Sequence, residues 1–227
     1  MLVVVVDTST PAITAAVTLI DPNATGRSGV DLLAQRRSVD ARAHAELLAL
    51  AVTEVLADVG ASGRDLAAIV AGLGPGPFTG LRVGLVTAAA MSQALGIPTY
   101  GVCSLDAMGT RARATTLVAI DARRKEIYWA VYRGGVALTE PAVDRPERVA
   151  ELLNGSGVEL AVGDGAQRYA AVLGMPVHEE PRYPPPLGLA ELAADRVRER
   201  RDSEILTPLY LRRPDAAEPR PPKAVIP

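Results

Sequence analysis

The sequence predicts an α/β protein made of two tandem βββαβα units, each a mixed sheet flanked by helices. A continuous apolar run rich in β-branched residues, Leu2–Val6, ends at Asp7, and a second run, Leu117–Ile120, ends at Asp121. Runs of this kind are typical of strands buried on both faces. A shift of 114 residues carries the first aspartate onto the second. The same shift aligns Ile13 with Ile127, Ala16 with Ala130, and Val17 with Val131.

The first unit continues with a hairpin turn, further strands and two helices. The turn has the composition Asp7-Thr8-Ser9-Thr10-Pro11, which is typical of tight turns. Asp40 is expected to cap a long helix that Gly60 ends. Gly96, followed by Pro98, is expected to end the second helix. The expected strands are 2–6, 13–19, 30–39, 69–73 and 99–102, and the expected helices are 41–59 and 81–95.

The second unit repeats this order in reduced form. A further helix, 187–201, follows the stiff segment Tyr183–Pro186. We expect a first lobe, 1–103, that carries a partner surface, and a second lobe, 104–213, whose late helix packs back on the first. Residues 214–227 have little to bury and are expected to be a disordered tail. The second unit's expected elements are strands 117–120, 127–132 and 159–162, helix 146–153, and a helix from about Gln167.

Composition places the chain among globular proteins and excludes several classes. It has 227 residues, of which 48% are hydrophobic and 22% charged, with a net charge of −2. This balance does not drive the whole molecule onto nucleic acid or an anionic membrane. Because Cys103 is its one cysteine, no internal disulfide can form, which favours a reducing cytoplasm. The first apolar run lacks a basic start and a cleavage site, so we expect no signal peptide.

The expected helix 81–95 is apolar on nearly every side, which is typical of a helix buried on more than one face. It is too short to span a bilayer, which needs roughly 20 residues. One face is expected to pack on a sheet and the other to meet another protein. Helix 41–59 adds Leu47 and Leu50 outside its core stripe. Arg82, unfavourable in a first helical turn, is expected to have a specific acceptor in the fold or on a partner.

Two polar segments leave structural and functional interpretations open. The turn at Asp7 resembles the phosphate and magnesium turn of actin-like ATPases and sugar kinases, but it contains no glycine. A plain Asx turn is favoured. The loop before helix 81–95 could cradle an anion, yet Pro75 and Pro77 lack N–H groups, so a rigid turn is favoured. The residues of this structural loop are Gly74, Gly76, Phe78, Thr79 and Gly80.

Metal and nucleophile chemistry have little support in the sequence. His44 has Leu48 at the position where a second zinc ligand would lie on the helix, and His178 is isolated. Cys103 has no histidine near it in sequence, so a free buried cysteine is the expected state. We predict no catalytic residue, no cofactor-binding residue and no metal ligand in this chain.

Five segments together resemble the TsaB (YeaZ) family, the bacterial actin-like family that supports synthesis of threonylcarbamoyladenosine in tRNA. The resemblance implies an actin-like fold (ASKHA, ribonuclease H-like) in duplicated form, and it covers the chain from first strand to tail. The segments are VDTST (6–10), RAHAELL (42–48), GLGPGPFTGLRVGL (72–85), IDARRKEIYWAVY (120–132) and PLYLRRPDA (208–216).

The resemblance also implies a role without independent catalysis. Family members pair through their N-terminal helices with TsaD, the catalytic subunit, and TsaE, an ATPase, joins them. The complex transfers a threonylcarbamoyl group from threonylcarbamoyl-AMP to N6 of adenosine 37 in tRNAs that read ANN codons. TsaD carries a metal-binding His-x-x-x-His where this chain has Ser104 and Met108, which are poor ligands. ATP, magnesium and metal are therefore expected on the partner subunits, and tRNA is expected to bind mainly through the complex.

On this interpretation the two early helices form the partner surface. Gly84 and Ala88, one turn apart, would let another helix come close, and the isolated chain would form a homodimer through the same face. The expected interface residues are His44, Leu47, Leu50, Ala51, Glu54, Arg82, Val83, Val86, Thr87 and Ala90.

Other functions remain open at this stage. An actin-like small-molecule kinase or ATPase would use Asp7 and Asp121 with Mg-ATP. A metallopeptidase is a third possibility, weakened by the missing histidine pair. Direct RNA binding through the arginines of 187–201 is less favoured than a solvated charged face.

Overall fold

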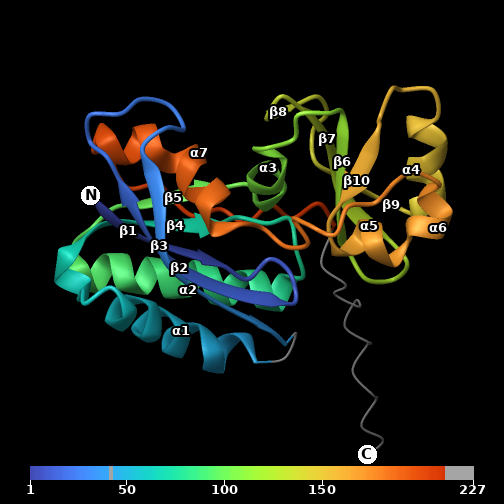
Figure 1. The fold of residues 1–227 in the computed structure, drawn as a ribbon. Coiled ribbons are helices and arrows are strands. Elements are labelled where there is room, and N and C mark those ends of the chain that lie inside the picture. Colours follow the sequence, from blue (N-terminus) through green and yellow to red (C-terminus); the bar gives the residue numbers. More distant parts are fainter. Residues whose placement is uncertain (41–42, 213–227) are drawn as a thin grey trace, which may run out of the picture.

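A computed structural model describes residues 1–40 and 43–212 as two lobes, each built on a sheet of five strands (Figure 1). The first sheet has the order β3-β2-β1-β4-β5. In the second, β10, β6, β7 and β8 follow one another and β9 also pairs with β7. The first-sheet strands are β1 (Leu2–Asp7), β2 (Ala12–Ile20), β3 (Val30–Val39), β4 (Leu66–Gly72) and β5 (Thr99–Val102). The second-sheet strands are β6 (Thr116–Asp121), β7 (Ile127–Arg133), β8 (Val136–Ala137), β9 (Ala142–Asp144) and β10 (Leu160–Val162).

The two lobes repeat one topology, which confirms the duplicated actin-like fold. In the first, β1 pairs antiparallel with β2 and parallel with β4. In the second, β6 pairs antiparallel with β7 and parallel with β10. As the sequence predicts, β1 ends at Asp7 and β6 ends at Asp121, so both aspartates lie at the carboxyl ends of central strands.

Helices cover both faces of the first sheet. Helices α1 (His44–Asp58) and α2 (Phe78–Leu95) lie side by side on one face, where Leu48, Val52 and Leu85 join a core with alternate strand residues. Helix α7 (Pro186–Arg198) covers the opposite face (Figure 1). The late helix therefore packs on the first sheet although the chain reaches it only after the second lobe.

Two helix starts differ from the sequence prediction. Helix α1 begins at His44 after Ala43, which makes no side-chain capping bond, so the predicted Asp40 cap is wrong. Helix α2 begins at Phe78, slightly earlier than predicted, because Pro77 in an extended conformation precedes it. The predicted ends are confirmed, since left-handed Gly60 follows α1 after Val59 and left-handed Gly96 follows α2 directly.

The helices of the second lobe are short. The predicted helix from Gln167 starts earlier and is broken, because Asp164 begins α5 and Tyr169 separates it from α6. No helix within residues 1–40 and 43–212 is long and apolar enough to cross a membrane. The predicted disordered tail, 214–227, lies outside the described residues. The remaining described elements are α3 (Ser104–Gly109), α4 (Pro146–Leu153), α5 (Asp164–Arg168), α6 (Ala170–Leu173) and the 3₁₀ turn Gly63–Asp65.

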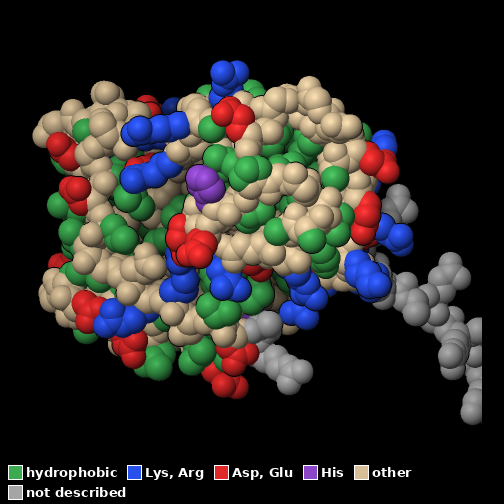
Figure 2. Space-filling view, turned by 45° about the vertical axis from the view of Figure 1, so that its right-hand side comes forward, with side chains coloured by type: hydrophobic (Ala, Val, Ile, Leu, Met, Phe, Trp, Pro, Cys, Tyr) green, Lys and Arg blue, Asp and Glu red, His purple; other side chains and the backbone are tan. Residues whose placement is uncertain are grey.

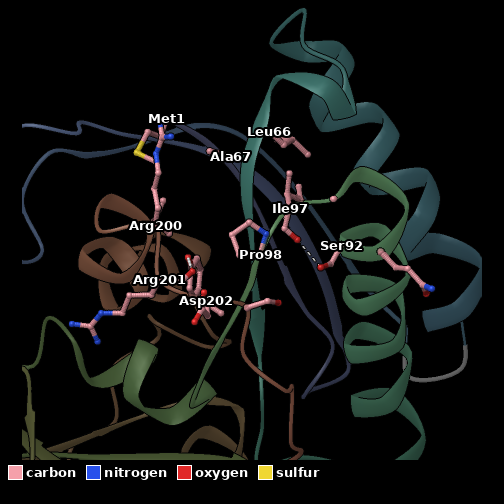
Figure 3. A pocket seen from close by; sticks show the side chains of 14 residues that line it. Met1, Leu66, Ala67, Ser92, Ile97, Pro98, Arg200, Arg201 and Asp202 are labelled. Atoms are coloured by element: carbon pink, nitrogen blue, oxygen red, sulfur yellow. Dashed lines mark hydrogen bonds between the residues drawn. The ribbon is translucent and has the colours of Figure 1, made fainter.

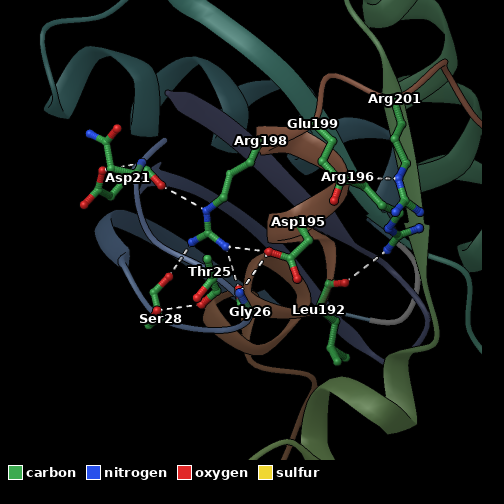
Figure 4. Close-up of polar contacts among 11 residues, drawn as sticks. Asp21, Thr25, Gly26, Ser28, Leu192, Asp195, Arg196, Arg198, Glu199 and Arg201 are labelled. Carbon is green, nitrogen blue, oxygen red and sulfur yellow. Dashed lines mark hydrogen bonds and ion pairs between the residues drawn. The ribbon is translucent and has the colours of Figure 1, made fainter.

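The arginines of α7 serve the fold. The buried guanidinium of Arg198 donates to the backbone carbonyls of Asp21, Gly26 and Ser28 and pairs with Asp195 at 2.9 Å, so it fixes the β2–β3 loop (Figure 4). Arg196 pairs with Glu204 at 2.8 Å. Both side chains therefore have partners within the fold, and the predicted solvated face is wrong for Arg198, whose side chain is buried.

After α7 the chain runs back along the first lobe as an extended segment, 203–212, which we call the strap. Glu204 N–H donates to the Thr99 carbonyl at 2.9 Å, and Leu209 N–H donates to the Leu73 carbonyl at 2.8 Å. Arg212 then reaches the second lobe, where it pairs with Glu126. The strap thus joins the edge of the first sheet to the tip of the second.

Candidate functional site

The first-lobe turn that could have held magnesium is closed by its own chain. Asp7 is 2% exposed. Its Oδ1 accepts hydrogen bonds from the Ser9 N–H at 3.0 Å and the Ser9 hydroxyl at 2.8 Å, and its Oδ2 accepts from the Ser104 hydroxyl at 2.6 Å. Burial raises the pKa of Asp7, against the lowering effect of these bonds. Because both oxygens already have donors, the residues here do not fit a divalent cation or a nucleotide phosphate.

The glycine loop interlocks with this turn instead of facing solvent. A Cβ atom on Gly76 would lie 2.1 Å from the Ser9 carbonyl oxygen, and one on Gly80 would lie 3.0 Å from the Thr8 carbonyl oxygen. Gly74, Gly76 and Gly80 are buried, while Phe78 and Thr79 are exposed. The space that an anion would occupy against these glycines is filled by backbone. We conclude that the loop sets the position of α2.

Thr8 fixes the first turns of α2. Its hydroxyl donates to the Gly80 carbonyl at 2.7 Å and accepts from the Gly84 N–H at 3.0 Å. A Cβ on Gly84 would lie 2.4 Å from that hydroxyl oxygen. The expectation that Gly84 and Ala88 admit a partner helix is therefore wrong, since both are buried and the close approach is made inside the chain.

His44 also belongs to this internal cluster. The residue is 7% exposed, and its ring Nε2 lies 3.0 Å from the Thr10 carbonyl oxygen. A position for His44 on a partner surface is wrong, because the start of α1 turns the ring toward the hairpin turn. The sequence could not indicate this contact, which joins residues 34 positions apart.

The other predicted interface residues lie on the outer faces of α1 and α2. Val86 is 66% exposed and Leu50 is 53% exposed, which is unusual for large apolar side chains on neighbouring helices. Leu47 and Val83 pack partly against the core. The exposed members of the set are Leu50, Glu54, Arg82, Val86 and Ala90, and the half-buried members are Leu47, Ala51, Val83 and Thr87. We call these nine residues the α1–α2 face.

Two shallow grooves border the ridge formed by Arg82 and Val86. One, of about 490 Å³, lies toward α1 and is also lined by Ala45 and Phe78. The other, of about 450 Å³, lies toward the strap and is lined by Leu206 and Pro208 among others. The side chains of a partner helix can pack into grooves that flank a ridge in this way.

Arg82 has its acceptor within the fold. Its Nε donates to the Tyr210 hydroxyl at 3.1 Å, and its guanidinium lies 3.6 Å from the centroid of the Phe78 ring. Phe78 and Tyr210 stack with their centroids 4.9 Å apart. Tyr210 is not among the predicted site residues, although the segment PLYLRRPDA contains it. The strap therefore completes one edge of the α1–α2 face.

A cavity of about 710 Å³ lies at the other end of the first sheet (Figure 3). It is lined by Met1, Pro98, Arg200 and Arg201, with Ser92 bonded to the Ile97 carbonyl at its wall. No member of the predicted site lines it. It is therefore not included in the candidate site.

Known proteins resemble this chain in both sequence and structure. A family model described as tRNA N6-adenosine threonylcarbamoyltransferase (TsaD) matches residues 37–182. The TsaB protein of Escherichia coli is 35% identical over 139 residues, covering 56% of this chain and 60% of that protein. The structure of YeaZ from Pseudomonas aeruginosa aligns with a TM-score of 0.74 and 28% identity, covering 92% of this chain and 99% of that one. The chain belongs to the TsaB (YeaZ) branch of this family.

A Mycobacterium leprae protein is 48% identical over 218 residues. The match covers 95% of this TsaB-family chain but 56% of that relative, so the chain spans little more than half of its length. The activity and partners of the relatives are therefore matters of proposal for this chain.

The position where the resemblance places TsaD's metal-binding histidines is occupied by structural groups in this TsaB-family chain. Ser104 donates its hydroxyl to Asp7, and Met108 is buried in the core of the second lobe. Burial raises the pKa of the Cys103 thiol to about 12, so it stays protonated at neutral pH. Within residues 1–40 and 43–212, no group of three or more His, Cys, Asp or Glu side chains is arranged to hold a metal ion.

Asp121, the second-lobe counterpart of Asp7, lies beside a second carboxylate, that of Asp164. Asp164 Oδ1 accepts the Asp121 N–H at 3.1 Å, and the Asp121 carboxylate pairs with Arg168 at 3.0 Å. Burial, with a further contribution from the Asp121 charge, raises the pKa of Asp164 to about 6. These two carboxylates lie together at the carboxyl end of β6.

We predict that Asp164→Asn stabilises the protein above pH 6. A raised native pKa means that the native state binds more protons than the unfolded state between about pH 4 and 6, so wild-type stability falls as pH rises through that window. The neutral amide keeps an oxygen acceptor and removes this cost, which is about 2 to 3 kcal/mol for a shift of two units. Thermal melts of both proteins at pH 4.5 and 7.5 should show a gain at pH 7.5 that shrinks at pH 4.5. A gain of equal size at both values would contradict the assignment.

Proposed function

We propose that this chain is a non-catalytic subunit of the complex that forms N6-threonylcarbamoyladenosine in tRNA. The relative from Escherichia coli is named a tRNA threonylcarbamoyladenosine biosynthesis protein, and the matching family model is named for the transferase. The observation that carries the proposal is the α1–α2 face, where Val86 and Leu50 are exposed on adjacent helices. Side chains of this kind gain stability when a partner covers them.

The proposed partner at this face is TsaD, the catalytic subunit, with TsaE as the ATPase of the complex. TsaD would transfer the threonylcarbamoyl group from threonylcarbamoyl-AMP to N6 of adenosine 37 in tRNAs that read ANN codons. A stable pair buries about 1,600 Å² in total, which two helices with flanking grooves can supply. In the absence of TsaD, the same face would pair two copies of this chain.

The first-lobe turn supports a role without chemistry of its own. The Asp7 carboxylate is saturated by Ser9 and Ser104. A kinase or ATPase needs that carboxylate to face magnesium and phosphate, so the internal bonds weigh against the alternative that uses Asp7 and Asp121. We propose that this chain holds no cofactor and that ATP, magnesium and metal bind to the partner subunits.

Reconstitution tests the proposal. Purified chain, TsaD and TsaE are mixed with threonylcarbamoyl-AMP, ATP and an unmodified tRNA transcript, and modified adenosine is measured by mass spectrometry. We expect no product from the chain alone, and at least a tenfold loss of product when it is omitted from the full mixture. Equal yields with and without the chain would contradict the proposal. Tight magnesium-dependent ATP binding by the isolated chain would favour the kinase instead.

A further inference from the structure

The turn between β6 and β7 holds three consecutive basic residues in a left-handed backbone conformation. The φ angles are 59° at Arg123, 55° at Arg124 and 61° at Lys125. Left-handed geometry brings Cβ close to the following carbonyl oxygen, so residues other than glycine, asparagine and aspartate adopt it rarely and singly. A run of three such residues that contains no glycine is therefore a strained segment.

The hairpin holds this conformation from both ends. Ala122 N–H donates to the Glu126 carbonyl at 2.9 Å, and Glu126 N–H donates to the Arg123 carbonyl at 2.9 Å. The flanking residues Asp121 and Ile127 are paired in the ladder of β6 and β7. The tip is thus a rigid support, on which three basic side chains project from consecutive positions. Strain that is retained in this way is typical of ligand-binding segments.

Two of the acidic groups beside the turn already have cationic partners. Asp121 pairs with Arg168 at 3.0 Å, and Glu126 pairs with Arg212 of the strap. Arg123 and Lys125 are exposed and have no side-chain partner among residues 1–40 and 43–212. These two residues of the turn therefore present positive charge that no described side chain pairs with.

Residues 122–126 themselves expose no apolar side chain. Ala122 is buried, and the three residues that follow it are all basic and exposed. A protein partner would be expected to find apolar anchors at the centre of its contact. Contacts to nucleic-acid phosphates, in contrast, need only cationic side chains and carry no sequence requirement. The face shown in Figure 2 has basic and acidic side chains interspersed, so a nucleic-acid contact would be local.

We propose that the turn 122–126 contacts the phosphate backbone of RNA. The inference rests on the proposed function, in which the RNA is the tRNA substrate of the complex. The strained turn would place Arg123 and Lys125 against phosphates without an ordering step, and the second lobe would thereby orient the RNA relative to the catalytic subunit.

The test measures binding of a fluorescent, unmodified tRNA transcript to the full chain in complex with TsaD. The variant Arg123→Ala/Lys125→Ala removes two charges from the turn. Its matched control, Arg64→Ala/Arg113→Ala, removes two exposed charges elsewhere that also have no side-chain partner in the described lobes. We expect the turn variant to bind the tRNA about tenfold more weakly. A plot of the logarithm of its binding constant against the logarithm of salt concentration should be less steep by about 1.5, as the loss of two phosphate contacts requires. The control should change affinity less than twofold.

Two further variants separate charge from strain. Arg123→Lys/Lys125→Arg keeps both charges and should bind as the wild type does. Arg123→Gly/Lys125→Gly removes the charges and relieves the backbone, so RNA binding should fall as in the alanine variant while the melting temperature rises by about 2 to 6 °C. A melting temperature that falls would remove the argument from strain.

Equal losses in the turn variant and its control, or no loss in either, would overturn the proposal. Weaker co-elution of the turn variant with TsaD, with RNA affinity unchanged, would assign the turn to an acidic protein surface and overturn it as well. Failure of the proposed function would give a different result: the wild-type chain would not support tRNA modification in the reconstituted mixture.

Discussion

Replacing Val86 by glutamate is expected to abolish the complex with TsaD while leaving the fold intact. The side chain is 66% exposed, so the free chain tolerates a charge there without penalty. In a covered interface the same carboxylate would be desolvated without a partner, which costs several kcal/mol. We expect at least a hundredfold weaker association by size-exclusion chromatography with light scattering, and a matching loss of tRNA modification.

Val136→Glu is the matched control, because Val136 is 61% exposed on β8 in the other lobe. It should leave both association and melting temperature unchanged. Leu47→Glu is a poorer probe than Val86→Glu, since Leu47 packs partly against the core and a charge there would also destabilise the chain. Normal co-elution of the Val86→Glu protein at a normal melting temperature would show that the α1–α2 face is not the binding surface.

Gly76→Ala is expected to destabilise the first lobe severely. The added methyl group would lie 2.1 Å from the Ser9 carbonyl oxygen, and that oxygen belongs to backbone that cannot rotate away. Forced overpacking of this kind costs about 3 kcal/mol or more. A protein of this size loses about 2 to 4 °C of melting temperature per kcal/mol, so a fall of about 10 °C is expected. Differential scanning calorimetry of the two proteins measures it.

Gly155→Ala provides the control for this substitution. Gly155 has a φ of +73°, and a Cβ there would meet nothing within 4 Å. Its substitution therefore carries only the backbone cost of about 1 kcal/mol, with a fall of 2 to 4 °C. If both proteins melted at the same temperature, the close contact between the loop and the hairpin turn would not be real.

The sequence predicted most of the fold because its signals are local. Buried β-branched runs identified β1 and β6, and β3 and β5 have the bounds expected from their patterns. Glycine marked both helix ends correctly, since a left-handed residue is a property of its own backbone. The cap predicted at Asp40 failed because the helix starts later, at His44, after Ala43.

The candidate site was less predictable because its geometry depends on distant residues. The periodicity of α1 and α2 indicated Leu50 and Val86 as surface residues, but it gave no sign that His44 turns toward Thr10. Tyr210 reaches Arg82 across 128 positions, and no pattern within either segment reports that stacking. The division into lobes at 103 and 104 stays a prediction.

The position of α7 has a consequence for biosynthesis. Leu189, Ala193 and Val197 complete the core on one face of the first sheet, whose strands are made from residues 2–102. A ribosome must therefore translate the whole second lobe before the first can bury that face. Until then the nascent chain exposes an apolar sheet surface, which is the condition under which chaperones bind.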